Sequence, residues 1–309
     1  MIDIVVTYCN DKDPIWKNQL DYYLKEEGVT DRQATGEERY RDWECFKYWF
    51  RGVEKNCKWV NKIFLIVASA SQVPEWLDVK HPKLRIVYHE EFIPKELLPT
   101  FNATTIELFI PNIEDLSDYY VYCNDDFYFI NEIDRDMFFL VHLPIYERSG
   151  TPLRKYTGAL LEGTDATFYK ALNNCMDFQL KIAKDRAKSY DICHLPTPHR
   201  KDFEQFIGMH FGDDIIKHQI PSKFRHPDNL SHKVYIDLYR DMAEFVVNEH
   251  LYDNSKYVTL KSTVDFDKYY NSDMVCFNDT EQLDDFELTK KKLIKFFEKK
   301  FPDKSSFEV

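Results

Sequence analysis

The fold is decided by the stretch Tyr119-Tyr120-Val121-Tyr122-Cys123-Asn124-Asp125-Asp126. Apolar and aromatic residues fill its first part, which predicts a buried strand, and three polar residues then end that strand abruptly. Similar short runs elsewhere alternate with helical patterns, as is typical of a mostly parallel sheet flanked by helices. We therefore expect an α/β fold in which Asn124, Asp125 and Asp126 stand at the carboxyl edge of a central strand.

The other elements follow from the spacing of apolar residues and from capping residues. Strands are predicted at 2–7, 63–68, 84–88, 257–261 and 274–277, and helices at 14–27, 37–56, 102–110, 202–218, 229–247 and 285–300. Asp13 before Pro14 is a typical start for the first of these helices, and Gly28 is a typical end. Because residues 142–250 are mainly helical, we expect a single domain over residues 1–309 with a helical insertion at 142–250.

Composition argues against several classes of protein. The chain has 309 residues and 44% hydrophobic content, which is enough to bury a large core. Its net charge of −12 argues against a nucleic-acid partner, so a site for phosphate groups would need local basic residues or a metal ion. We expect neither a secretory signal nor a transmembrane helix, because no window approaches 18 consecutive apolar residues and the first residues lack a basic start. The seven cysteines include no Cys-x-x-Cys pair and indicate a reducing compartment.

Two acidic motifs follow predicted strands. Asn124-Asp125-Asp126 is the first, and Asn278-Asp279 after the run 274–277 is the second. Carboxylates at the carboxyl ends of parallel strands point into the crevice where ligands bind, and a hard divalent ion takes such carboxylates together with phosphate oxygens. Helix capping is the alternative interpretation of each motif taken alone. Two such motifs in one chain favour a shared metal site.

A histidine and three arginines are further candidates. His194 lies in His194-Leu195-Pro196-Thr197-Pro198, where the prolines exclude a helix and stiffen the loop. It could serve as a general base, or it could be a structural histidine in a proline turn. Arg225, just before a predicted helix, could clamp a diphosphate or be a solvated loop residue. Arg39 and Arg41 supply local positive charge, and a solvated helix face is the alternative.

The motifs occur in the order of the conserved blocks of the stealth family, which the chain resembles. The run from Ile2 to Tyr8, with Asn10 and Asp13, is similar to the first block, although the family usually has Trp where this chain has Tyr8. The second block is resembled by Arg39-Tyr40-Arg41-Asp42, Trp59-Val60-Asn61-Lys62-Ile63-Phe64, Pro74-Glu75-Trp76-Leu77, Leu98-Pro99-Thr100-Phe101-Asn102 and residues 122–126. His194-Leu195-Pro196 and the Arg225 segment look like the third block, and Val275-Cys276-Phe277-Asn278-Asp279 looks like the fourth.

This resemblance implies a stealth-type catalytic domain with a glycosyltransferase-A-like α/β core that depends on Mg²⁺ (or Mn²⁺). It implies transfer of a sugar-1-phosphate from a nucleotide diphosphate sugar, with a nucleoside monophosphate leaving. The implied catalytic residues are His194, Arg225, Asp125 and Asp126, and the implied metal ligands are Asp126, Asn278 and Asp279. The expected substrate-binding residues are Thr7, Tyr8, Asn10, Asp13, Arg39, Arg41, Asn102 and Asn124. His199 lies outside the implied catalytic set, so its loss is expected to be mild.

The expected partners are a nucleotide-sugar donor, with UDP-sugars favoured, and a glycan or lipid-linked oligosaccharide acceptor, as in capsular or exopolysaccharide synthesis. A cytoplasmic enzyme could meet such an acceptor by peripheral association with the inner face of the membrane. One alternative is a metal-dependent glycosyltransferase, which would release a nucleoside diphosphate instead of a monophosphate. Another is a non-catalytic polysaccharide-binding module, for which the aromatic residues would suit sugar stacking. The oligomeric state does not follow from the pattern.

Overall fold

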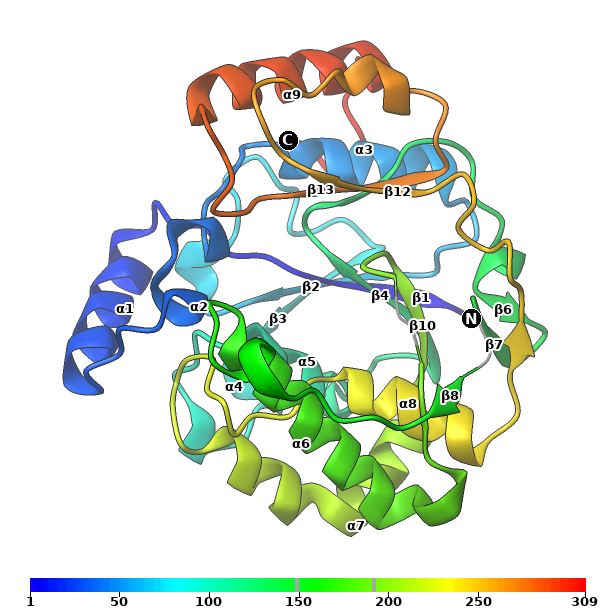
Figure 1. The fold of residues 1–309 in the computed structure, drawn as a ribbon. Coiled ribbons are helices and arrows are strands. Elements are labelled where there is room, and N and C mark those ends of the chain that lie inside the picture. The colour runs from blue at the N-terminus through cyan, green and yellow to red at the C-terminus, as the bar shows by residue number, and fades with distance from the viewer. Residues whose placement is uncertain (148–149, 191–192) are drawn as a thin grey trace.

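Residues 1–147, 150–190 and 193–309 are described by a computed structural model, which is mixed α/β (Figure 1). Its main sheet has the strand order β10–β4–β1–β2–β3, in which β1 to β4 run parallel and β10 runs antiparallel to β4. These strands are Asp3–Thr7 (β1), Ile63–Val67 (β2), Leu84–Tyr88 (β3), Tyr119–Asn124 (β4) and Thr197–Arg200 (β10). The glycosyltransferase-A-like, mostly parallel sheet flanked by helices that the sequence predicts is thereby confirmed.

The central position of β1 aligns two strand ends. Thr7, the last residue of β1, lies opposite Asn124 of β4 and opposite Ile66 of β2. The polar residues that follow β1 and β4 therefore emerge at the same carboxyl edge, where ligands bind in open α/β sheets.

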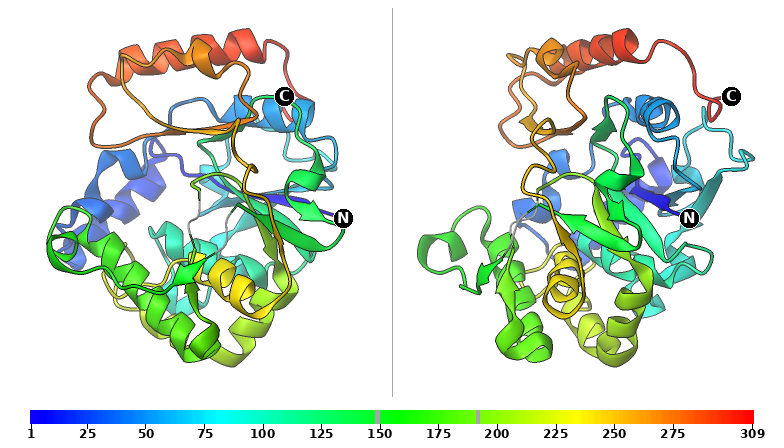
Figure 2. Two further views of the ribbon diagram at one scale, coloured as in Figure 1. Left: turned by 45° about the vertical axis from the view of Figure 1, so that its right-hand side comes forward. Right: turned by 90° about the vertical axis from the view of Figure 1, so that its right-hand side faces the viewer.

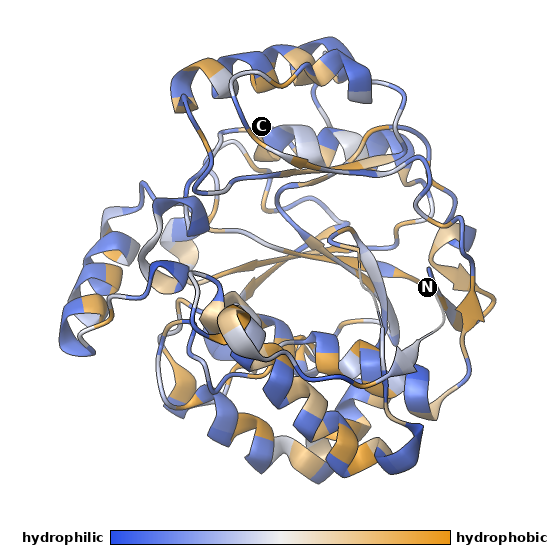
Figure 3. Ribbon diagram, in the orientation of Figure 1, coloured by the Kyte–Doolittle hydropathy of each residue, from blue (hydrophilic) through white to orange (hydrophobic). Residues whose placement is uncertain are grey.

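Alternating side chains of the main strands pack into two separate cores. Ile4 and Val6 of β1 face one core, which also contains residues of α3 and α9, whereas Val5 faces another, which contains residues of α5 to α8. This alternation follows from the two-residue period of a strand. Figures 1 and 2 show α3 and α9 on one side of the sheet and α5 to α8 on the other. Figure 3 shows apolar colour on the inner strands β1 and β2, and a mixture of apolar and polar colours along the covering helices.

The helices agree with the predictions at most positions. They are Pro14–Glu26 (α1), Arg32–Thr35 (α2), Phe46–Asn56 (α3), His89–Phe92 (α4), Ala103–Phe109 (α5), Ala166–Ala183 (α6), Lys201–Gln219 (α7), Lys233–Met242 (α8) and Phe286–Lys300 (α9). The helix predicted at 37–56 begins only at Phe46, because Glu44 has a positive φ of 57° that an α-helix cannot contain. The helix predicted at 229–247 is also shorter, since Asn229 instead closes a turn by accepting a hydrogen bond of 2.7 Å from the His226 amide.

Part of the segment predicted as a stiff proline loop is a strand. Residues Thr197–Arg200 form β10, with Pro198 opposite Val121 of β4. Proline lacks an amide hydrogen but is tolerated in an edge strand, and β10 is the edge of the main sheet. The segment 142–250 thus contains α6, α7 and α8 but also contributes a strand to the main sheet.

A small sheet brings the second acidic motif to the first. It has the order β12–β13–β5, where β5 is Phe127–Phe129, β12 is Lys256–Thr259 and β13 is Met274–Asn278. The Phe277 amide donates a hydrogen bond of 3.0 Å to the Asp126 carbonyl, and Cys276 lies opposite Phe127. Asn278 and Asp279 therefore emerge beside Asp126, as a shared site would require.

The remaining strands are short. They are Phe139–Leu140 (β6), Leu143–Tyr146 (β7), Thr151–Pro152 (β8), Lys188–Ser189 (β9) and Val246–Val247 (β11).

In the described part of the chain, none of the helices combines the length and the apolar character needed to cross a bilayer.

Candidate active site

A large cleft of about 1140 Å³ opens at the carboxyl edge of the main sheet. Most of the residues predicted to form the site line it, namely Thr7, Tyr8, Arg39, Arg41, Asn124, Asp125, Asp126, His194, Arg225, Asn278 and Asp279. They come from separate parts of the chain. The structure therefore brings together the motifs that the sequence shows only as isolated segments.

Three residues predicted to bind substrate are not among those that line the cleft. Asp13 accepts a hydrogen bond of 2.9 Å from the Ile15 amide as the N-cap of α1, and its other oxygen accepts one of 2.8 Å from Gln72 Nε2. The Asn10 amide donates to Gln72 Oε1 at 2.7 Å. Through these contacts Asp13 and Asn10 fix the loop after β1.

Asn102 also positions a neighbouring segment instead of lining the cleft. It is fully buried, caps α5, and donates hydrogen bonds to the Phe224 carbonyl at 3.2 Å and to Asn229 Oδ1 at 2.8 Å. Arg225 lies between these two partners in sequence. Asn102 therefore holds the loop that carries Arg225.

One wall of the cleft is acidic. Burial raises the pKa of Asp125 well above its usual range, and the neighbouring Asp126 and Asp42 raise it further. Burial likewise raises the pKa of Asp126, against the attraction of His194, and raises the pKa of Asp279 to about 6 against the attraction of Arg41. Carboxylates crowded together at low exposure are costly unless a cation compensates them.

Three oxygens on this wall have no partner among the described residues. They are Asn124 Oδ1, Asp126 Oδ1 and Asp279 Oδ1, and all three are buried. Buried polar atoms are almost always satisfied, so such oxygens need an explanation. Two carboxylate oxygens and an amide oxygen are the donor type that Mg²⁺ or Mn²⁺ prefers. The wall therefore fits the hard cation that the resemblance implies.

Another wall of the cleft is basic. Burial lowers the pKa of Arg225, and the nearby positive charge of Arg39 lowers it further, whereas Glu107 opposes the change. Arg39 donates a hydrogen bond of 2.7 Å to Gln33 Oε1, and Lys233 also lines the cleft. Two guanidinium groups at one cavity in a chain of net charge −12 form the local basic pocket that an anionic ligand needs.

A buried carboxylate below this wall was not predicted from the sequence. Glu107 of α5 is 8% exposed and accepts hydrogen bonds from His232 and, at 2.9 Å, from the Tyr122 hydroxyl, which lies 3.2 Å from Thr7 Oγ1. Burial raises the pKa of Glu107, but His232, Tyr122 and Arg225 outweigh it, and the net shift is downward. The sequence does hold one indication of it, because Glu107 is the one charged residue in the otherwise apolar run 106–109.

His232, the partner of Glu107, carried no signal in the sequence. Burial by itself lowers its pKa, but the adjacent Glu107 carboxylate raises it, and the net shift is upward. The two shifts are opposite in direction and favour a charged pair at neutral pH. The pair joins the start of α8 to α5, and the Tyr122 hydroxyl links Glu107 to Thr7 at the end of β1.

His194 differs from the other candidates in being exposed. Its ring meets Phe127 edge-on, with 4.8 Å between the ring centroids, and Tyr257 at 5.8 Å. It lies close enough to Asp126 to lower the pKa of that carboxyl group. An accessible imidazole beside the acidic wall has the position that a general base requires.

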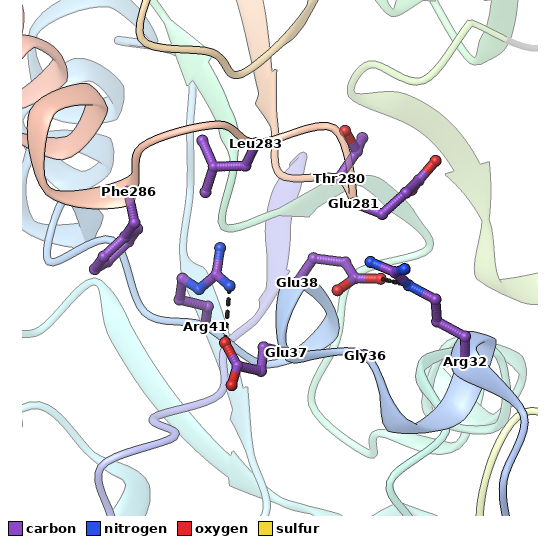
Figure 4. Close-up of a pocket in the computed structure, with 9 residues that line it drawn as sticks. All are labelled: Arg32, Gly36, Glu37, Glu38, Arg41, Thr280, Glu281, Leu283 and Phe286. Atoms are coloured by element: carbon purple, nitrogen blue, oxygen red, sulfur yellow. Dashed lines mark hydrogen bonds and ion pairs between the residues drawn. The ribbon is translucent and has the colours of Figure 1, made fainter.

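A side pocket of about 410 Å³ adjoins the acidic wall (Figure 4). Arg41 borders both this pocket and the cleft. Its guanidinium is bonded to Glu37 at 3.1 Å and to Asp279 at 2.9 Å, and it lies 5.0 Å from the centre of the Phe286 ring. Because two carboxylates already engage Arg41, its geometry suits orientation of Asp279 better than capture of a donor.

A mostly parallel sheet with an acidic and a basic wall at its carboxyl edge defines an enzyme of the glycosyltransferase-A-like α/β class. Comparison with known proteins identifies the family within this class. Residues 39–144 match the family model "Stealth protein CR2, conserved region 2".

Full-length relatives extend the match over the whole chain. A capsular polysaccharide phosphotransferase of Streptococcus pneumoniae is 33% identical, covering 99% of this chain and 98% of the relative. A receptor polysaccharide phosphotransferase of Streptococcus oralis is 32% identical over 100% of this chain and 99% of the relative. A capsular polysaccharide phosphotransferase of Streptococcus thermophilus is 43% identical over 47% of this chain and 62% of the relative. The chain belongs to the stealth family, and it is a phosphotransferase.

Proposed function

We propose that this enzyme transfers a hexose- or N-acetylhexosamine-1-phosphate from a nucleotide diphosphate sugar to a hydroxyl group of a glycan acceptor. The products are a phosphodiester between sugars and a nucleoside monophosphate, and a UDP-sugar is the favoured donor. The observation that carries the proposal is that low-exposure carboxylates line the same cleft as Arg39 and Arg225. A diphosphate is the substrate group that needs a cation on one side and guanidinium groups on the other.

The metal we propose is Mg²⁺ or Mn²⁺. The residues that would hold it are Asp126, Asn278 and Asp279, with Asn124 close by, and the unpartnered oxygens of Asp126, Asp279 and Asn124 support this choice among the described residues. When bound, the ion would neutralise charge on the diphosphate and on the leaving nucleotide.

The chemical step is an in-line displacement at phosphorus. The acceptor oxygen forms a bond to the phosphorus atom that carries the sugar, while the bond from that phosphorus to the oxygen of the nucleoside phosphate breaks. The acceptor hydroxyl proton passes to His194, whose exposed ring lines the cleft. Asp125 is the alternative base, because burial raises its pKa and makes it able to hold a proton.

The arginine wall supplies binding and orientation. Arg225 presents a planar fork of donors that matches phosphate oxygens, and Asn102 holds its loop in place. Thr7, Tyr8 and Arg39 also line the cleft and would contact the nucleoside or sugar. Burial of these groups away from water strengthens their interaction with developing negative charge.

The biological setting we propose is capsular or exopolysaccharide synthesis, which the names of the relatives support. The acceptor would be a growing glycan or a lipid-linked oligosaccharide. We place the enzyme in the cytoplasm, where peripheral association with the inner face of the membrane would bring it to a lipid-linked acceptor.

The leaving group tests the proposal. The protein is incubated with Mg²⁺, a glycan acceptor and a panel of UDP- and CDP-sugars, and the released nucleotide is identified. We expect the monophosphate together with a phosphodiester-linked product. Release of the diphosphate would instead identify a glycosyltransferase that breaks the anomeric C–O bond. Saturable glycan binding with no nucleotide release would identify a polysaccharide-binding module.

A further inference from the structure

Three side chains at the acidic wall bring together three different donor atoms. Among the described residues, one group of potential metal ligands has all its donor atoms within 4.8 Å of one another, and it consists of Asp126, His194 and Cys276. The Cys276 thiol donates a hydrogen bond of 3.3 Å to Asp126 Oδ2, while the buried Asp126 Oδ1 has no partner in the described part of the chain. Asp126 lies directly before β5, Cys276 lies in the middle of β13, and His194 lies in the loop before β10.

The donor set does not suit Mg²⁺. Mg²⁺ demands oxygen ligands, whereas a thiolate and an imidazole select zinc or a similar transition metal. Ligand atoms around tetrahedral zinc lie roughly 3.3–3.8 Å apart, given metal–ligand distances of about 2.0–2.3 Å. The Asp126–Cys276 pair, at 3.3 Å, already has this separation, and the exposed His194 has a ring nitrogen within 4.8 Å of both donor atoms.

The position of the group leaves room for one more ligand. Asp126 and His194 line the cleft, whereas Cys276 is fully buried behind Asp126. Three protein ligands with one face open to water are the arrangement of an accessible zinc site rather than a closed structural one.

We propose that Asp126, His194 and Cys276 form a Zn²⁺ site, and that Zn²⁺ bound there excludes the hard cation and removes the general base. On binding, the Cys276 thiol releases its proton to solvent and a Zn–S bond forms, so one thiolate and one carboxylate balance the charge of the ion. The inhibitory consequence rests on the proposed function, because it assumes that Asp126 and His194 act in phosphotransfer. Metal binding itself does not depend on that assumption.

Cobalt spectroscopy tests the site without substrate. Metal-free protein is titrated with Co²⁺, whose bond to a thiolate gives a near-ultraviolet absorption band. We expect this band in the wild type, its removal by Zn²⁺, and weaker Co²⁺ binding in excess Mg²⁺, since both ions need Asp126. Cys276→Ser should abolish the band and weaken Zn²⁺ binding by at least about tenfold.

Cys193→Ser is the matched control. Cys193 is a second thiol that lines the same cleft, and it donates a hydrogen bond of 2.7 Å to Glu147 Oε2. The control should keep the band and the Zn²⁺ affinity. If Cys276→Ser misfolds by circular dichroism, His194→Ala serves instead, because its exposed side chain can be removed without a cavity, and it should also weaken Zn²⁺ binding by at least about tenfold.

Two outcomes overturn the proposal: a wild type without a cobalt–thiolate band, or a band that persists in Cys276→Ser. Zn²⁺ inhibition of transfer, normalised to the Mg²⁺-dependent rate of each variant, should weaken in parallel with the loss of binding. If the band behaves as expected but no nucleotide sugar is consumed, the site is supported and the proposed function fails. The two ideas are therefore separable.

Discussion

Arg41 Nη1 donates a hydrogen bond of 2.9 Å to Asp279 Oδ2, joining residues 238 positions apart in the chain. Trp43 Nε1 donates to the same oxygen at 3.2 Å. Oδ2 is thus held from two sides, while the buried Oδ1 atom has no partner among the described residues. The loop before α3 therefore orients the carboxylate at the end of β13, and Asp279 is prepared to meet a cation.

Removing the charge of either Asp126 or Asp279 should abolish transfer. Asp279→Asn and Asp126→Asn each remove one formal charge from the hard-cation site while changing volume little. We expect the rate in limiting Mg²⁺ to fall to background, with far-ultraviolet circular dichroism unchanged. Asp267→Asn, at an exposed carboxylate paired with Lys299, is the control and should leave the rate intact. Wild-type rates in both site variants would rule out the metal assignment.

Arg225 should not be replaceable by lysine. A guanidinium matches phosphate oxygens with a planar fork that an ammonium group cannot reproduce. Arg225→Lys should lower turnover at saturating donor by more than about tenfold, equivalent to about 1.4 kcal/mol of lost transition-state stabilisation. Arg135→Lys, at an exposed arginine, should show wild-type kinetics. Equal turnover in the two variants would indicate that Arg225 does not contact the transferred group.

His194→Ala should reduce transfer by at least about 10²-fold, since a positioned base contributes about 10²- to 10⁴-fold. Donor binding should change little, because Arg225 and the acidic wall hold the diphosphate. His250→Ala, at an exposed histidine outside the cleft, is the control. If the His194→Ala enzyme remains active, His194 is not the general base, and Asp125 becomes the candidate.

His199 cannot serve as a mild control, contrary to the expectation from sequence. It is 3% exposed, its Nδ1 atom lies 2.6 Å from Glu204 Oε1, and its ring stacks on Tyr120. His199→Ala would leave Glu204 buried without its histidine partner, which is a large destabilisation. This variant should lose thermal stability, and any loss of activity should follow the loss of folded protein.

The Glu107–His232 pair should show strong energetic coupling. Glu107→Gln leaves His232 without its charged partner and should lower the free energy of unfolding by about 3 kcal/mol, the lower end for a broken buried pair. His232→Gln should be destabilising for the same reason. In urea denaturation, the double variant should cost clearly less than the sum of the two single variants. Strict additivity would show that the pair is not formed in solution.

Acid should weaken the fold through His89. Burial lowers the pKa of this histidine from 6.5 to about 4. Below the unfolded pKa of 6.5 the unfolded chain binds a proton that the native state refuses, so stability is full above pH 6.5 and declines until about pH 4. At about 1.4 kcal/mol per pKa unit, this contributes a loss of about 2 kcal/mol between about pH 7 and about pH 4.5. His89→Leu should shrink the stability loss between these two pH values by that amount, whereas His250→Leu should not.

Local sequence patterns were enough to place the main sheet and its acidic edge. Buried parallel strands appear as apolar runs, and polar residues directly after such runs must lie at the carboxyl edge, so the pattern alone assigns Asp125 and Asp126 to that edge. For Asp279 the pattern gives only its place after a strand, because that strand belongs to a separate small sheet. Helix capping also follows local rules: Asp13 caps the start of the first helix and Gly28 follows its end, as predicted. These features depend on residues that are near one another along the chain.

Which of these residues meet was settled by long-range packing. Glu107 and His232, like Asp126 and Cys276, are more than a hundred positions apart, and their contacts arise from strand pairing and helix packing that no local pattern encodes. The same reason explains why Asn102 and Asp13 hold loops in place while Arg41 orients Asp279. A residue type and its neighbours specify what chemistry is available, whereas the tertiary fold specifies which atoms come within bonding distance and lose their water.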